Sequence, residues 1–216
     1  MVNSTITEYL LLAASIVGGY LVGAIPSGLL ISRMMGRDPL KEGSGKTGAT
    51  NTLRTSGPVA GIAVAVLDIA KGVFVVWAVR SIAWPDDVWA GLAVGVAAAA
   101  AIIGHNWSVW VRLVAGKWGG GRGILTALGA VVTISPVVAL AAFLAGVLVM
   151  ALTRYMAWGA IAGAVGAIVT LVALGVTGGL SAWLVPGAIL WCLLVVLGFH
   201  DNIERLLSGT EPRLGT

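Results

Sequence analysis

Residues 38–54 read Asp38-Pro-Leu-Lys-Glu-Gly-Ser-Gly-Lys-Thr-Gly-Ala-Thr-Asn-Thr-Leu-Arg54, a polar island between two segments that are apolar enough for a membrane. Its glycines alternate with side chains that can donate hydrogen bonds: Ser44, Lys46, Thr47, Thr50 and Asn51. Clustered donors on a glycine-rich backbone, beside basic side chains, are typical of a site for phosphate or another small anion. The island therefore predicts an anion site in a chain that is otherwise built for the bilayer.

Two nucleotide-binding motifs of soluble enzymes look like this island, but the sequence around it disfavours both. Gly43-Ser-Gly-Lys-Thr47 matches the end of a P-loop, and residues 43–48 have the spacing of a dinucleotide fingerprint. A P-loop needs a glycine where this chain has Leu40, and both motifs need a buried strand immediately upstream. The upstream segment is instead an apolar run of helical length.

The composition is that of a polytopic membrane protein. Of 216 residues, 58% are hydrophobic and only 10% are charged, whereas about a quarter are charged in soluble domains. The mean hydropathy is +0.99. No linker or long charge run divides the chain, so we predict one all-α domain over residues 1–216, embedded in the lipid bilayer. The net charge of +4 concerns membrane topology here, and we expect no nucleic-acid partner.

The apolar runs predict a bundle of seven transmembrane helices, some of them short or kinked. The predicted spans are residues 9–31, 59–79, 88–104, 124–134, 136–151, 157–176 and 182–198. Pro136 divides a run that is too long for one crossing, and Pro26 is expected to bend the first span. Asp68 and Lys71 share one face of the second span and can pair there, either to fix helix packing or to support the island.

Seven spans place the N-terminus and the C-terminal tail on opposite sides of the membrane. All basic residues except Lys71 and Arg80 then fall on the side of the island. The positive-inside rule makes that side cytoplasmic, so we predict an external N-terminus and a cytoplasmic C-terminus. A second polar stretch, residues 104–123, and the tail, residues 200–213, lie on the same side and can converge with the island.

The pooled side chains of these segments suit anionic substrates better than other chemistry. His105 and His200 have no carboxylate or cysteine at ligand spacing, so we predict no metal and no other cofactor. Ser44 is the best candidate for a nucleophilic serine, but no base stands out beside it.

The motifs resemble those of the bacterial acyl-phosphate:glycerol-3-phosphate acyltransferases, over nearly the whole chain and in the same order. The first motif corresponds to residues 38–51 with Arg54, the second to Gly104-His-Asn-Trp leading to Gly120-Gly-Arg-Gly-Ile-Leu-Thr126, and the third to Asn202-Ile-Glu-Arg-Leu-Leu-Ser-Gly-Thr-Glu211. Asp68-Ile-Ala-Lys-Gly72 looks like the family's signature in the second span.

The resemblance implies a membrane enzyme that transfers a fatty acyl group from acyl phosphate to the 1-hydroxyl of glycerol 3-phosphate, giving lysophosphatidate and phosphate. This is the first acylation of phospholipid synthesis. It implies a monomer in the bacterial inner membrane, with the active site facing the cytoplasm. The catalytic residues it implies are Ser44, Arg54, Arg122 and His200. The implied substrate-binding residues are Gly43, Gly45, Lys46, Gly48, Thr50, Asn51, His105, Gly120, Gly121, Gly123, Asn202 and Glu211.

Four features depart from the family pattern. Lys46 stands where the family usually has asparagine, and Arg122 stands where it has lysine. A few residues around 115–119 look inserted. His200 lies two residues before Asn202, whereas the family histidine lies three before, at the position of Phe199; one residue on a helix turns a side chain by about 100°.

Two alternatives are also compatible with the sequence. One is a paralogue that uses a different phosphorylated acceptor, which the motif departures permit. The other is a non-enzymatic carrier of small anions or phospholipids, although the spans supply few polar groups for a path besides Asp68 and Lys71.

Overall fold

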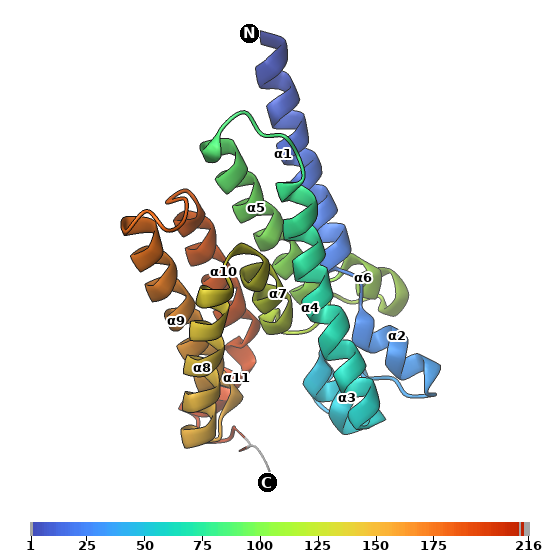
Figure 1. The fold of residues 1–216 in the computed structure, drawn as a ribbon. Helices are drawn as coiled ribbons and strands as arrows, with labels where there is room; N and C mark the ends of the chain where they lie inside the picture. Colours follow the sequence, from blue (N-terminus) through green and yellow to red (C-terminus); the bar gives the residue numbers. More distant parts are fainter. Residues whose placement is uncertain (1, 212, 214–216) are drawn as a thin grey trace.

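The computed structural model describes residues 2–211 and residue 213, and within them the chain forms helices and no strands (Figure 1). The helices are α1 (Val2–Gly23), α2 (Ser27–Met34), α3 (Ala49–Ser56), α4 (Pro58–Arg80), α5 (Asp87–Asn106), α6 (Val109–Ala115), α7 (Ile124–Ile134), α8 (Pro136–Thr153), α9 (Met156–Val176), α10 (Leu184–Gly198) and α11 (His200–Leu207). The prediction of an all-helical chain is confirmed for this part.

Five segments in the described chain are long and apolar enough to cross a membrane: Ile6–Met34, Pro58–Arg80, Asp87–Ala115, Pro136–Thr153 and Met156–Val176. A sixth arises if α10 and α11, which are bent by 58° relative to each other, form one broken span. Helix α7 has only 11 residues and is too short to qualify. The structure thus supports a polytopic membrane protein with five or six such segments.

Proline marks two helix breaks that the sequence anticipated. Helix α1 ends at Gly23 and α2 begins at Ser27, with Pro26 between them. Helix α7 ends at Ile134, and Pro136 is the first residue of α8. The hydroxyl of Ser135 accepts a hydrogen bond from the Val138 amide and caps α8. A proline cannot donate to the preceding turn, which explains why the helices stop there.

Glycines let the helices of the bundle approach closely. A Cβ at Gly23 in α1 would collide with the main chain of α5 at Ala101, and a Cβ at Gly72 in α4 would collide with the Thr126 carbonyl of α7. Gly159 in α9 meets the main chain of α8 at Gly146 in the same way. Such small residues at helix contacts are common in membrane bundles. The contacts fix α4, α5 and α7 around a shared buried core.

Three of the short helices, α2, α3 and α11, lie in the half of the molecule away from the start of α1 (Figure 1). The island leads from α2 into α3, the glycine stretch (residues 119–123) connects α6 to α7, and the tail (residues 200–213) begins with α11. The fold therefore gathers the polar segments near the same end, as the sequence predicted.

Candidate active site

A small polar cavity of about 60 Å³ lies where the island, the glycine stretch and the start of the tail meet. The residues that line it are Lys46, Gly48, Ala49, Thr50, Asn51, Asp68, His105, Gly121, Arg122, Gly123, Ile124, Leu125, Met156 and Phe199. They come from α3, α4, α5, α7, α9 and the connecting segments. Residues far apart in the sequence thus form one site.

Three helices begin at this cavity. Ala49 and Thr50 open α3, Ile124 and Leu125 open α7, and Met156 opens α9. The first amide groups of a helix have no partner within it, and the helix dipole places partial positive charge there. Several helix N-termini beside Lys46 and Arg122 make the cavity suited to anions.

Asn51 holds the island in shape. Its side-chain oxygen accepts a hydrogen bond from the Ser44 amide at 2.8 Å. Its side-chain nitrogen donates to the carbonyls of Pro39, Glu42 and Lys46. Gly43 and Gly45 take left-handed backbone conformations, with φ of 62° and 69°, which glycine adopts without strain. The Asn51 amide therefore shapes the loop, and its contact with a substrate phosphate stays a prediction.

The glycine stretch is fixed against both the island and α5. The Gly120 carbonyl accepts from the Thr47 amide at 3.0 Å, and the Gly121 amide donates to the His105 carbonyl at 2.9 Å. A Cβ at Gly120 would collide with main-chain oxygens of α5, and a Cβ at Gly121 would collide with Nε2 of His105. The apparent insertion forms the exposed turn after α6, at Gly116 to Trp118, and leaves this pairing in place.

Arg122 is the cation most enclosed by the site. Its guanidinium carbon lies 5.1 Å from the centre of the Phe199 ring. Its buried Nε has no hydrogen-bond partner within the described part of the chain. Burial, and then the nearby charge of Arg205, lowers the pKa of Arg122, with a smaller contribution from Arg54. Arg122 therefore lies near the cations of both the island helix and the tail, in a position to receive an anion.

Glu211 accepts hydrogen bonds from two other side chains of the tail. Glu211 accepts from the Asn202 side-chain nitrogen at 2.5 Å and from the Arg205 Nε at 2.7 Å. Asn202 is buried, and its side-chain oxygen has no partner in the region that the structure describes. Glu211 thus orients two tail side chains, and neither Asn202 nor Glu211 lines the cavity.

His200 does not line the cavity, whereas its neighbour Phe199 does. The His200 side chain is exposed, and its Nε2 lies 2.6 Å from a carboxylate oxygen of Asp201. Its Nδ1 lies 3.0 Å from the Leu197 carbonyl. Phe199 is 1% exposed and packs under Arg122. The sequence signal for Phe199 was its position three residues before Asn202, where the resemblance predicts a histidine.

Eight predicted site residues line the cavity: Lys46, Gly48, Thr50, Asn51, His105, Gly121, Arg122 and Gly123. Among the other predicted residues, Ser44 and Arg54 are exposed and Gly120 lies behind the lining. Sequence reasoning did not select Met156, Phe199 or the hydrophobic residues that open α7. Apolar residues at a site cannot be told from span residues by composition alone.

An apolar groove of about 310 Å³ adjoins the polar cavity. It runs between α7, α8, α9 and α10 and is lined by residues such as Leu128, Phe143 and Ala164. Thr50, Ile124, Leu125 and Met156 line both the groove and the cavity. The two spaces therefore lie side by side, with Lys46 and Arg122 in one and an apolar lining in the other.

Comparison with known proteins identifies the family. The model of the glycerol-3-phosphate acyltransferase family matches residues 13–209. A glycerol-3-phosphate acyltransferase of Thermus thermophilus is 38% identical over 196 residues, covering 91% of this chain and 92% of the relative. One of Synechococcus elongatus is 39% identical over 203 residues, covering 91% of each chain.

A solved structure agrees with these relatives. The crystal structure of PlsY, an integral membrane glycerol 3-phosphate acyltransferase in its glycerol 3-phosphate form, superposes with a TM-score of 0.80 and 30% sequence identity. The match covers 95% of this chain and 96% of that one, and the lysophosphatidic acid form of PlsY matches equally well. The chain belongs to the glycerol-3-phosphate acyltransferase family.

Proposed function

We propose that the protein transfers a fatty acyl group from acyl phosphate to the 1-hydroxyl of glycerol 3-phosphate. The hydroxyl oxygen attacks the acyl carbonyl carbon, the bond from that carbon to the phosphate oxygen breaks, and phosphate leaves with the hydroxyl proton. The products are lysophosphatidate and inorganic phosphate. Relatives that bear the acyltransferase name, and PlsY forms with glycerol 3-phosphate and lysophosphatidic acid, support this reaction.

The observation that carries the proposal is the junction between the polar cavity and the apolar groove. An acyl phosphate has an anionic head and a hydrocarbon tail, and these match the two adjoining spaces. With the head in the cavity and the chain in the groove, the acyl carbonyl lies beside the shared residues Thr50, Ile124, Leu125 and Met156. Burying the chain against apolar side chains stabilises the complex by about 0.8 kcal/mol for each CH₂ group removed from water.

Two phosphates need two sets of positive groups. We assign Arg122 and the starts of α3 and α7, which line the cavity, to the phosphate of the acyl donor. We assign Arg54 and Lys46, with the backbone around Gly43, Gly45 and Gly48, to the phosphate of glycerol 3-phosphate. Arg122 can hold phosphate oxygens through two parallel donors, which fixes orientation better than a lysine would.

The site has to position its substrates and stabilise charge more than it has to supply a base. Acyl phosphate is an activated donor with a good leaving group, so orienting the hydroxyl on the carbonyl supplies much of the rate. Fixed donors stabilise the oxyanion that forms on the carbonyl. A phosphate oxygen of the substrate can accept the hydroxyl proton. Ser44 then binds phosphate and forms no acyl intermediate.

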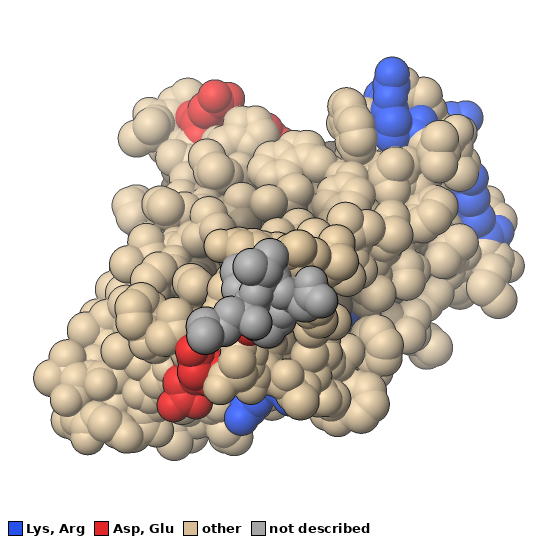
Figure 2. All heavy atoms as spheres, turned by 90° about the horizontal axis from the view of Figure 1, so that it is seen from above, with Lys and Arg blue, Asp and Glu red and all other residues tan. Residues whose placement is uncertain are grey.

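The topology that we propose has seven membrane crossings, with α7 as a short crossing inside the bundle. The start of α1 and helix α11 lie at opposite ends of the bundle (Figure 1), which fits an odd number. Seen from the end where α1 begins, the surface is mostly uncharged, with scattered charged side chains toward its margin (Figure 2). By the positive-inside rule this end is external, and the active site faces the cytoplasm of a bacterial inner membrane.

The working unit that we propose is a monomer with one domain over residues 1–216.

A test compares donors and acceptors with the purified protein in detergent. Palmitoyl phosphate with glycerol 3-phosphate should yield equal amounts of lysophosphatidate and phosphate. Palmitoyl coenzyme A as donor, or glycerol as acceptor, should yield almost none, because each lacks one of the two groups that the site holds. Product from the coenzyme A ester alone, or from another phosphorylated polyol alone, would overturn the donor or the acceptor assignment.

A further inference from the structure

Asp68 and Lys71 form an ion pair in the interior of the bundle. Asp68 is 1% exposed and Lys71 is 7% exposed. Nζ of Lys71 lies 2.8 Å from Oδ1 of Asp68, across one turn of α4. Buried ion pairs seldom stabilise a fold more than apolar residues of the same size would. The other contacts of the pair therefore bear on its role.

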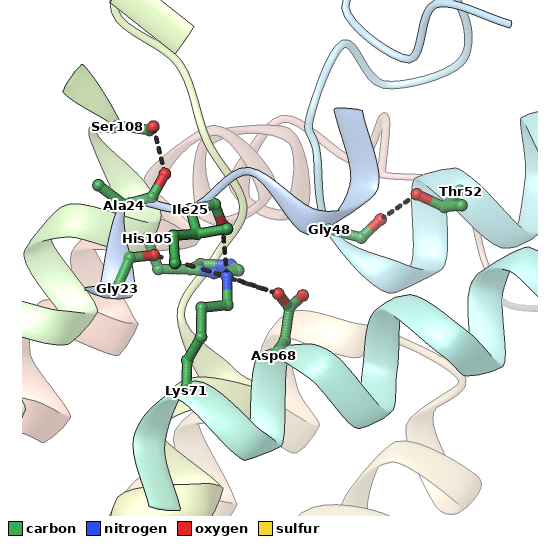
Figure 3. Close-up of polar contacts among 9 residues, drawn as sticks. All are labelled: Gly23, Ala24, Ile25, Gly48, Thr52, Asp68, Lys71, His105 and Ser108. Atoms are coloured by element: carbon green, nitrogen blue, oxygen red, sulfur yellow. Dashed lines mark hydrogen bonds and ion pairs between the residues drawn. The ribbon is translucent and has the colours of Figure 1, made fainter. Parts of the chain in front are cut away.

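Lys71 also contacts the break between α1 and α2 (Figure 3). Its ammonium donates to the Ile25 carbonyl at 2.7 Å and to the Gly23 carbonyl at 3.5 Å. The carbonyl between them, that of Ala24, accepts from the Ser108 hydroxyl at 2.5 Å. Three successive carbonyls at the end of α1 are thus bound by donors from α4 and from the start of α6.

This break sets the direction in which the chain enters the site. Helix α2 follows Pro26 and leads to the island. A Cβ at Gly28, in its first turn, would collide with the Thr47 carbonyl, so α2 packs directly on the island. Lys71 and Ser108 therefore act on the island through α2, although neither of them lines the cavity.

The same cluster reaches the glycine stretch through His105. Nδ1 of His105 lies 3.4 Å from Nζ of Lys71 and 3.8 Å from Oδ1 of Asp68 (Figure 3). The other edge of the ring, at Nε2, touches Gly121, which precedes Arg122. Asp68 and His105 both line the cavity. The cluster of Asp68, Lys71 and His105 thus contacts both the α1–α2 break, which leads to the island, and the glycine stretch.

We propose that Lys71 and Ser108 are positioning residues for acceptor binding, which hold the island and the glycine stretch in register through the α1–α2 break. This inference rests on the proposed function, because it is read out through glycerol 3-phosphate. A shift of the island by a fraction of an ångström should weaken binding of the acceptor without unfolding the bundle.

The main test separates stability from positioning. Lys71→Met leaves a buried unpaired carboxylate, so this variant should lose both thermal stability and activity. Lys71→Met combined with Asp68→Leu removes both charges and should recover the melting temperature. The carbonyls of Gly23 and Ile25 still lack their donor, so the KM for glycerol 3-phosphate should remain raised by about tenfold or more. Recovery of that KM together with stability would overturn the proposal.

Ser108→Ala gives an independent test without a change of charge and outside the cavity lining. It should raise the KM for glycerol 3-phosphate severalfold while the KM for palmitoyl phosphate changes less. Ser15→Ala is its control, because Ser15 is also buried and donates to a main-chain carbonyl of α1, that of Leu11. Arg80→Met is the control for Lys71→Met, since Arg80, the last residue of α4, donates to the Thr133 carbonyl.

The outcomes distinguish this proposal from the proposed function. An inactive wild type would count against the acyl transfer itself. An active wild type with an unchanged KM for glycerol 3-phosphate in Ser108→Ala would contradict the positioning role alone.

Discussion

The ammonium nitrogen of Lys46 lies 3.1 Å from Oδ2 of Asp201, so an ion pair joins the island to the tail beside the polar cavity. Lys46 is also part of the cavity lining. The carboxylate of Asp201 therefore pairs with the ammonium group of Lys46, which could otherwise bind an anionic substrate. Lys46 departs from the asparagine that is usual in the family, and Asp201 supplies its partner in this chain.

Asp201→Asn should release Lys46 for the substrate. We expect the KM for the anionic substrates to fall by up to about fivefold, since a partly exposed ion pair is worth up to about 1 kcal/mol. Steady-state kinetics at low salt would measure this change. Glu204→Gln removes the same charge from the exposed face of α11 and should leave the KM as it is. A higher KM in Asp201→Asn would mean that the pair serves to hold the tail in place.

Arg122→Lys should make the reaction sensitive to alkaline pH. Burial and nearby cations lower the pKa of Arg122, but the usual value for arginine is so high that the group stays charged. A lysine starts from about 10.4, and the same burial would lower its pKa further. A lowered pKa means that the positive charge is lost as the pH rises. The kcat/KM of Arg122→Lys should therefore fall at a lower pH than that of the wild type; identical profiles would argue against a phosphate contact at this position.

His200→Ala should reduce activity less than Arg54→Ala. The His200 ring is exposed and bound to Asp201 and Leu197, whereas Arg54 lies near enough to Arg122 to affect its pKa. Loss of one charged contact to phosphate costs about 1.5–3 kcal/mol, or roughly 10- to 150-fold in kcat/KM. We expect a change of only a few fold for the histidine. An equal or larger loss in His200→Ala would show that this side chain enters the site during turnover.

Gly72→Ala should destabilise the bundle. The added methyl group would meet the Thr126 carbonyl and the Ala130 amide of α7, and such overpacking costs about 1–3 kcal/mol. Gly18→Ala is the matched control, because the added methyl group would meet no atom of another helix within 4 Å. Alanine also favours a helix over glycine by about 1 kcal/mol, so Gly18→Ala should be neutral or stabilising. Thermal unfolding in detergent would measure both; equal melting temperatures would contradict the close contact of α4 and α7.

The long helices were predictable because hydrophobicity and proline determine them. The second predicted span, residues 59–79, matches Pro58–Arg80, and the break at Pro136 falls where expected. The short helices α2, α3, α6 and α11 were not identified separately. Each has only seven or eight residues, which is too short for a clear apolar period. Arg54, for example, lies in a helix that the sequence showed only as part of a polar island.

The candidate site was predictable where polar residues carry it. Clustered glycines and donors pointed to Lys46, Thr50 and Gly121, all of which line the cavity. The sequence could not place Met156 there, because an apolar residue at the start of a span looks like any other. It also could not reveal that Lys71 binds the carbonyls at the α1–α2 break, since main-chain partners leave no pattern in the side chains.

The most direct measurement is the formation of lysophosphatidate from palmitoyl phosphate and glycerol 3-phosphate, by the wild type and by Arg122→Ala at equal amounts of folded protein. We expect the wild type to release lysophosphatidate and phosphate in equal amounts. Arg122→Ala should be slower by roughly 10- to 150-fold, because a buried charged contact to phosphate is lost. No product from the wild type, or an undiminished rate in Arg122→Ala, would contradict the account.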